Sequence, residues 1–179
     1  MANVPSLLRA FERFVALPWD AAVSGQEKVW FCIYEPRDER WVRAEMASFE
    51  IAARNAGHGW TVCDLSDALG EWLGAHEYRE SYFARPDLFG SASDEFREAV
   101  AARVKACLRN ADTGTLVALT GVASLFGVAS VAELVASVAG EIRGRLAVFF
   151  PGRRVENNYR ILDARDGWNY LAVPIEGEQ

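Results

Sequence analysis

The sequence predicts one α/β domain over residues 1–179, built on a mostly parallel central sheet that helices cover on both faces. Four continuous apolar runs, rich in β-branched and aromatic residues, have the length of a strand. They lie at residues 29–34, 60–63, 115–120 and 145–150. A strand that is apolar on both sides is typical of a parallel sheet buried between two helical layers. A chain of 179 residues can bury one sizeable core, so one domain is expected.

Between these runs, apolar residues recur at steps of three or four, which predicts amphipathic helices. The expected helices run from Ser6 to Pro18, from about 38 to 56, from Asp64 or Ser66 to about 73, from Ser93 to about 109, and from Leu125 to Ile142. Residues 74–93 break this alternation, and a short helix or an aromatic loop is expected there. Near the end, Asp166-Gly167 separates two apolar segments, 160–162 and 168–173. This pattern predicts a β-hairpin, expected as an antiparallel edge of the sheet.

Composition narrows the function classes. The net charge is −6 and the basic residues are scattered, so we expect no specific nucleic-acid binding and no anionic membrane surface as partner. No apolar run approaches the ~20 residues of a membrane span, and the N-terminus lacks the order of a signal peptide, so a cytoplasmic location is expected. Cys32, Cys63 and Cys107 form no close pair in sequence and each lies in an apolar pattern, which predicts buried, reduced thiols.

Polar residues follow the expected strands at their carboxyl ends, where open parallel sheets tend to bind ligands. Acids and arginines together suggest a polar crevice. The alternative is that they are solvated loop residues and helix caps, since loops are polar in any α/β protein. The residues of this candidate crevice are Glu35, Asp38, Asp64, Thr120, Gly121, Arg153 and Arg154.

The motifs of common enzymes are absent from the sequence. Gly121 and Gly127 flank the only strand-to-helix turn with two glycines, but the second glycine is one residue too far along for a phosphate-binding loop. Val128 stands where the lysine of that loop belongs, so ATP binding is not expected. His58 and His76 are the only histidines, have no partner at metal-ligand spacing and are expected in solvated loops. Without a Gly-x-Ser-x-Gly turn or a base near a cysteine, no catalytic residue, metal or cofactor is expected.

The irregular segment combines large aromatic side chains with arginines, a composition typical of protein interfaces. Packing as a lid over the core would also account for it. The candidate partner-binding residues are Trp72, Tyr78, Arg79, Tyr82, Phe83, Arg85 and Phe89.

Short motifs in the C-terminal third resemble the BrxB family of bacterial BREX phage-defence systems. They are Leu-Thr-Gly-Val-Ala-Ser-Leu-Phe at 119–126, Val-Phe-Phe-Pro-Gly at 148–152, Asn-Tyr at 169–170 and Pro-Ile at 174–175. Tyr-Glu-Pro-Arg-Asp-Glu at 34–39 and Val-Cys-Asp-Leu at 62–65 also match in kind. The family has an Arg-Ser-His tripeptide where this chain has Gly127–Ser130, a glycine where this chain has Ala123, and a longer segment after Pro151-Gly152. The chain therefore resembles a divergent member.

This resemblance implies a small non-catalytic component of a defence complex. Its expected partners are the alkaline-phosphatase-like PglZ protein and the large ATPase of the system. The runner-up hypothesis is a small enzyme or a nucleotide-binding or other ligand-binding protein that uses the strand-end crevice. The third is a DNA-contacting module.

Overall fold

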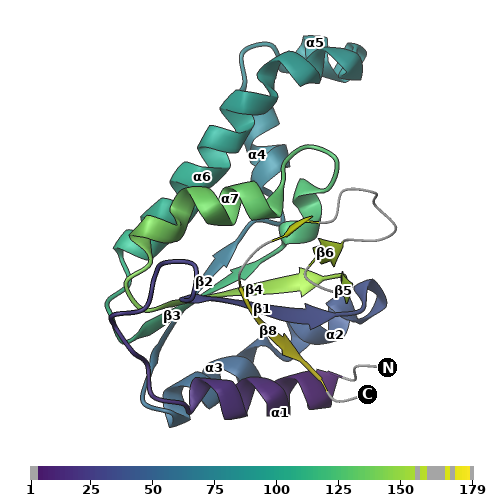
Figure 1. Ribbon diagram of the computed structural model, residues 1–179. Coiled ribbons are helices and arrows are strands. Elements are labelled where there is room, and N and C mark those ends of the chain that lie inside the picture. The colour runs from purple at the N-terminus through teal and green to yellow at the C-terminus, as the bar shows by residue number, and fades with distance from the viewer. Residues whose placement is uncertain (1–3, 156–157, 161–167, 170–171, 178–179) are drawn as a thin grey trace.

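A five-stranded, all-parallel sheet forms the centre of the protein (Figure 1). The computed structural model describes residues 4–155, 158–160, 168–169 and 172–177. The strands are β1 (Val29–Tyr34), β2 (Gly59–Asp64), β3 (Thr115–Thr120), β4 (Arg145–Pro151) and β8 (Val173–Glu176), in the spatial order β2-β3-β4-β1-β8. The four strands predicted from apolar runs are confirmed, and they are parallel.

Helices cover both faces of this sheet (Figure 1). On one face lie α1 (Val4–Val15), α2 (Glu39–Ala44) and α3 (Met46–Asn55). On the other lie α4 (Ala68–Ala75), α6 (Ser93–Arg109) and α7 (Val131–Val138). Short 3-10 helices complete the chain: η1 (Pro36–Asp38), η2 (Pro86–Ala92), η3 (Val122–Leu125) and η4 (Ala139–Glu141). In the described part of the chain, no helix has the length and apolar character needed to cross a bilayer.

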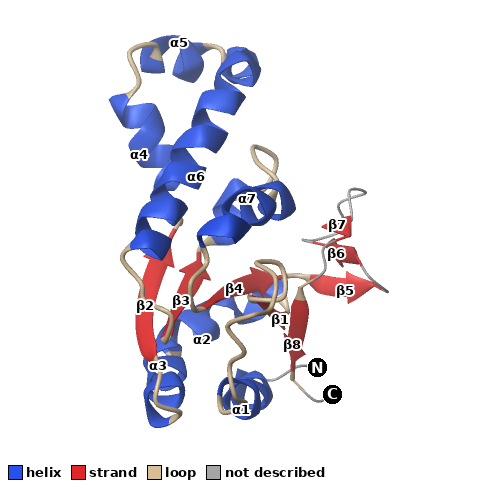
Figure 2. Cartoon of the chain, turned by 60° about the vertical axis from the view of Figure 1, so that its left-hand side comes forward, coloured by secondary structure: helices blue, strands red, loops and turns tan. Residues whose placement is uncertain are grey.

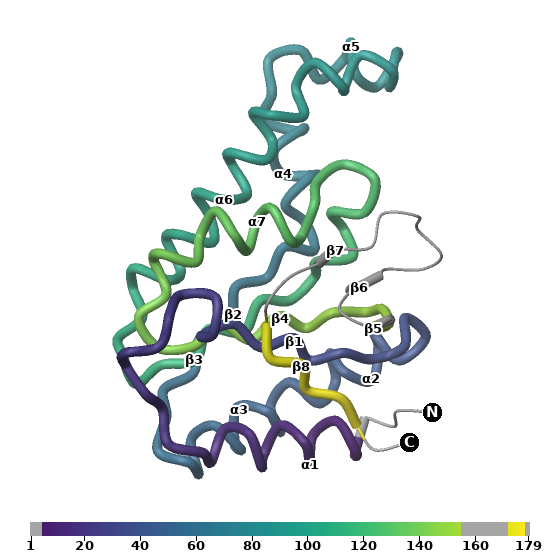
Figure 3. Tube along the Cα trace, viewed as in Figure 1, coloured from purple at the N-terminus to yellow at the C-terminus, as the bar shows by residue number. Residues whose placement is uncertain are grey.

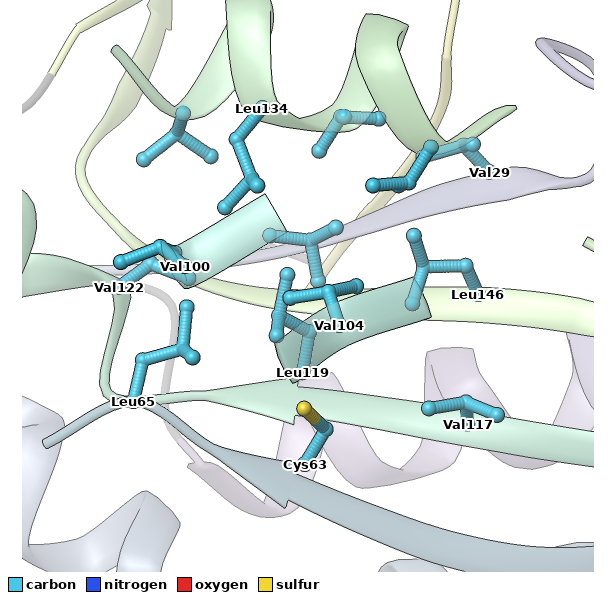
Figure 4. Packing of buried hydrophobic residues seen from close by; sticks show 14 of the residues in the cluster. Val29, Cys63, Leu65, Val100, Val104, Val117, Leu119, Val122, Leu134 and Leu146 are labelled. Carbon is cyan, nitrogen blue, oxygen red and sulfur yellow. The ribbon is translucent and has the colours of Figure 1, made fainter. Parts of the chain in front are cut away.

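Alternate side chains of each buried strand enter two different cores. In β1, Val29 and Phe31 pack with α6 and α7, whereas Trp30 and Cys32 pack with α1 and α3. Figure 4 shows the first core, in which side chains of the sheet such as Leu119 meet Val104 of α6. A strand with two buried faces has no polar side to display, which is why these strands read as continuous apolar runs.

Several helix boundaries differ from the sequence-based expectation, among them the start of α4, which has Asp67 at its N-cap position and not Asp64 or Ser66, and the end of α7, which lies at Val138 and not at Ile142. Ser6 lies inside α1 and not at its start. The helix expected from 38 to 56 divides into η1, α2 and α3, because Glu45 leaves the helical conformation with ψ near 7°. The helix expected from Leu125 begins only at Val131, since Gly127 adopts a left-handed conformation and the Ser130 side chain accepts the N-cap hydrogen bond.

The C-terminal strands form a second, small sheet. It contains β5 (Arg153–Val155), β6 (Asn158–Arg160) and β7 (Trp168–Asn169), all paired antiparallel. β6 and β7 overlap the predicted hairpin arms, 160–162 and 168–173, only in part: residues 161–167, with the Asp166-Gly167 turn, and 170–171 lie outside the described residues, and Val173 belongs to β8. The hairpin joins β5 and not the large sheet, whose edge is β8, paired parallel to β1.

The part of the chain that connects β2 to β3 forms a helical arm, which projects away from the sheet. It consists of α4, the six-residue α5 (Arg79–Ala84), η2 and the N-terminal half of α6. Figure 3 shows this part of the chain extending away from the strands, with α5 at its far end. The segment expected to be a short helix or an aromatic loop is therefore the tip of this arm.

Candidate functional site

The ends of β2 and β3 hold three of the predicted crevice residues together. Asp64 Oδ1 accepts hydrogen bonds from the Ser66 backbone N–H at 3.1 Å, from Ser66 Oγ at 2.6 Å and from Thr120 Oγ1 at 3.1 Å. Gly121 follows with φ +72°, and a Cβ there would lie 2.6 Å from Asp64 Oδ1 and would clash with the Ser66 backbone. Glycine at 121 therefore allows the two strand ends to approach each other.

A chain of hydrogen bonds continues from this point to the end of β1. Arg43 Nη2 donates to Ser66 Oγ at 2.7 Å, and its Nε donates to Glu39 Oε1 at 2.7 Å. The other oxygen of Glu39 accepts from the Tyr34 hydroxyl at 2.5 Å. We call the six residues the strand-end network: Tyr34, Glu39, Arg43, Asp64, Ser66 and Thr120. It joins the ends of β1, β2 and β3 through one helix, α2.

The charges of this network oppose acid–base chemistry at neutral pH. Burial acts to raise the pKa of Asp64, but hydrogen bonds from Ser66 and Thr120, with the nearby Arg43, outweigh it and hold that pKa below its usual range. Hydrogen bonding to Glu39 raises the pKa of Arg43. Burial, then the hydrogen bond to Glu39, raises the pKa of Tyr34. At neutral pH Asp64 is therefore ionised, Arg43 is cationic and Tyr34 is protonated. General acid–base catalysis favours groups whose pKa lies near the working pH, and these three groups do not meet that condition.

The other predicted crevice residues lie in two further places. Glu35 Oε1 is 3.9 Å from Arg153 Nε, at the adjacent ends of β1 and β5. Asp38 closes η1, where its backbone N–H donates to the Glu35 carbonyl. Arg154 lines a groove of about 430 Å³ between α1 and β8. The seven residues do not form one crevice, because β5 turns away from the sheet and carries Arg154 to the α1 side.

Both histidines are packed against aromatic rings, which contradicts the prediction of solvated loop histidines. His58 stacks on Trp19 with ring centroids 3.5 Å apart and planes within 2°. His76 lies 4.6 Å from the Trp72 ring and 5.2 Å from the Tyr82 ring, and its Nδ1 accepts from the Tyr78 backbone N–H. Within the described ranges, no three His, Cys, Asp or Glu residues gather as a metal site would require.

The cysteines are free thiols, and two of them, Cys63 and Cys107, are neighbours in space. The prediction that they are buried is confirmed for Cys32 and Cys63 and is wrong for Cys107. Cys32 and Cys63 are buried, and Cys107 is half-buried. Burial raises the pKa of Cys32 and Cys63, and the adjacent Cys107 adds to the effect on Cys63. Thiols held protonated are poor nucleophiles.

The aromatic residues of the arm fall into two groups. Trp72 packs edge to face on Phe89 and on the buried Phe96, with centroids 6.0 and 5.7 Å apart. Phe89 lies tilted against Phe96 at 6.2 Å, and Tyr82 packs edge to face on Phe89 at 6.3 Å. These rings hold α4 and η2 against α6, and α5 against η2. The candidates Trp72, Tyr82 and Phe89 are therefore half-buried packing residues.

The second group is exposed. Tyr78 is 56% exposed, Phe83 62% and Leu88 40%, all on α5, its N-cap or η2. Leu88 was not among the predicted partner-binding residues. Arg79 and Arg85 lie beside them in solvent, where Arg79 donates to the Gly74 carbonyl and Arg85 forms a two-bond pair with Asp87. We call Tyr78, Phe83 and Leu88 the arm-tip residues.

No family model matches the chain, and neither the curated proteins nor the solved structures include a match to it. The functional argument therefore depends on the geometry above and on the motifs in the sequence.

Proposed function

We propose that the chain is a non-catalytic adaptor of a bacterial BREX-type phage-defence complex, and that it acts in the cytoplasm by binding protein partners through its arm tip. The observation that carries the proposal is the exposure of Tyr78, Phe83 and Leu88 at the far end of a projecting helical arm. When a partner covers large apolar side chains that are exposed to solvent, the burial of their surface stabilises the complex. Aromatic and arginine side chains together are typical of interface anchors.

The choice of complex rests on the resemblance of residues 119–126 and 148–152 to the BrxB family. On that basis the first partner is a PglZ-like protein of the alkaline-phosphatase superfamily, and the large ATPase of the system is the second. The arm supports binding of this kind because its inner rings fix the tip in one arrangement. A rigid tip loses less conformational entropy on binding than a mobile loop would.

The strand ends give less support to an enzyme or a small-ligand binder. Each residue of the strand-end network is bonded to another member: Asp64 to Ser66 and Thr120, and Glu39 to Tyr34 and Arg43. A ligand would have to replace these bonds at a cost. The Gly121–Gly127 turn contains the short 3-10 helix η3, and a loop follows before α7 starts at Val131, so its backbone amides do not open an α-helix as those of a phosphate-binding loop do.

Affinity capture from a host that carries the defence system tests the proposal. The tagged chain should enrich the PglZ-like protein, identified by mass spectrometry. Phe83→Asp should abolish this enrichment because it places a charge in the apolar contact. Ile51→Asp is the matched control, since Ile51 is 57% exposed on α3, which covers the opposite face of the sheet from the arm helices. Capture by the wild-type chain without the PglZ-like protein, or equal capture by the Phe83→Asp variant, contradicts the proposal.

A further inference from the structure

The outer edge of β2 is an open sheet edge. Gly59 and Leu65 donate their backbone N–H groups to the carbonyls of Gly114 and Thr120, at 3.1 and 2.9 Å. Because backbone bonding alternates along a strand, the odd-numbered residues of β2 face β3. The N–H and C=O groups of Trp60, Val62 and Asp64 therefore point outward. Across the described residues, nothing in the chain forms a hydrogen bond with these groups.

Apart from Asp64 at its carboxyl end, nothing in the composition of β2 protects this edge. Natural proteins block exposed edges with proline, lysine or a covering segment, since an open edge pairs with other strands. β2 has the sequence Gly-Trp-Thr-Val-Cys-Asp, without proline or lysine, and Val62 is 45% exposed. Figure 2 shows β2 at the side of the sheet with no helix or strand beyond it. By contrast, the opposite edge strand, β8, contains Pro174, which lacks the N–H that an added strand would need.

The edge is complementary to itself. Two copies related by a twofold axis place their β2 strands antiparallel. With the axis at Val62, the two Val62 residues face each other, and Trp60 of each copy faces Asp64 of the other. All three outward residues then form hydrogen-bonded pairs, a β-branched side chain meets its equivalent, and no carboxylate faces a carboxylate. An unrelated strand would need its own matching pattern, whereas this register requires nothing beyond the chain itself.

We propose that the protein forms a symmetric dimer through β2, so that two five-stranded sheets join into one continuous sheet across the Val62 pair. Each β2 packs on α3 with one face and on α6 with the other. These helices flank the pairing line without covering it. The arm tips remain free for the partner of the proposed function, so the dimer carries two such surfaces.

Sedimentation velocity of the purified chain over a range of concentrations tests this proposal. The wild-type chain should be a dimer that dissociates on dilution. Val62→Lys should weaken dimerisation at least roughly tenfold, because it sets two positive charges opposite each other at the axis. Since Val62 faces solvent, this change should leave the thermal unfolding of the monomer nearly unchanged.

Leu17→Lys provides the matched control. It introduces the same charge at an apolar residue that is 56% exposed beside β8, at the opposite edge of the sheet from β2, so it alters the net charge equally but should leave the dimer intact. Val62→Cys provides a second measurement. In a hydrogen-bonded antiparallel pair the two Cα atoms lie about 5.5 Å apart, within disulfide reach, so this variant should cross-link under mild oxidation where the wild-type chain does not. A monomeric wild-type chain, a dimer unaffected by Val62→Lys, or a dimer that Val62→Cys fails to cross-link would each overturn the proposal.

Discussion

Arg43 Nη2 lies 2.7 Å from Ser66 Oγ, and this hydrogen bond joins the helix that follows β1 to the loop that follows β2. The two strands are not neighbours, because β3 and β4 lie between them in the sheet. Arg43 also pairs with Glu39, and Ser66 donates to Asp64. The network therefore works as a brace across the carboxyl ends of the sheet, and its mutations should change stability.

Asp64→Asn should lower the free energy of unfolding by about 1 kcal/mol or less at neutral pH, since it replaces an ionised acceptor in a partly exposed site. The pKa of Asp64 is lowered in the folded protein. Its contribution is therefore present above the ordinary aspartate pKa of about 4 and is lost as the pH falls through the folded value. Urea unfolding should give a difference between variant and wild type that shrinks below about pH 4. Asp67→Asn controls for the charge change, and a difference that stays constant with pH would refute this role.

Gly121→Ala should be more damaging than Gly127→Ala. Both glycines have positive φ, at +72° and +78°, so each substitution carries backbone strain of about 1 kcal/mol. Only at 121 would the new Cβ also meet other atoms, those of Ser66 and Asp64, whereas no atom lies within 4 Å at 127. In thermal unfolding, the wild-type chain should have the highest melting temperature, Gly127→Ala a lower one and Gly121→Ala the lowest. Equal melting temperatures for the two variants would contradict the close approach described for the strand ends.

Trp72→Ala should loosen the arm, because Trp72 packs on Phe89 and Phe96 and its loss leaves a gap under α4. For a half-buried tryptophan we expect a loss of about 2 kcal/mol, with new protease cleavage in residues 76–92. Phe83→Ala removes an exposed ring and should change stability by no more than about 0.5 kcal/mol. If Phe83→Ala proves as destabilising as Trp72→Ala, the division of the arm into packing and exposed rings is wrong.

The core strands could be predicted because a strand that is buried on both faces has a continuous apolar sequence, such as Val29–Tyr34. β8, with the sequence Val-Pro-Ile-Glu, has no such continuous apolar run. From the sequence, Val173 is predicted to end a hairpin arm. In the structure it begins β8, because the chain returns to pair alongside β1 as a parallel edge strand. Helix ends were less predictable, since Ser130 and Leu125 both suit the start of a helix and only the turn at Gly127 selects between them.

The candidate site was half predictable. Asp64, Thr120 and Gly121 follow strands and could be found by position, but Glu39, Arg43 and Ser66 were missed. The spacing of Glu39 and Arg43, four apart on a helix, was a usable signal. No local signal shows that Arg43 reaches Ser66, or that His58 stacks on Trp19, because these contacts arise from packing between distant segments.

The central claim is that the arm tip binds a protein partner, and a titration of the purified PglZ-like protein tests it most directly. The double variant Tyr78→Ala/Phe83→Ala should bind at least roughly 30-fold more weakly than the wild-type chain, which corresponds to about 2 kcal/mol, with an unchanged melting temperature. Trp41→Ala removes a ring that is 67% exposed on α2 and should bind as the wild type does. An affinity of the double variant equal to that of the wild type would contradict the account.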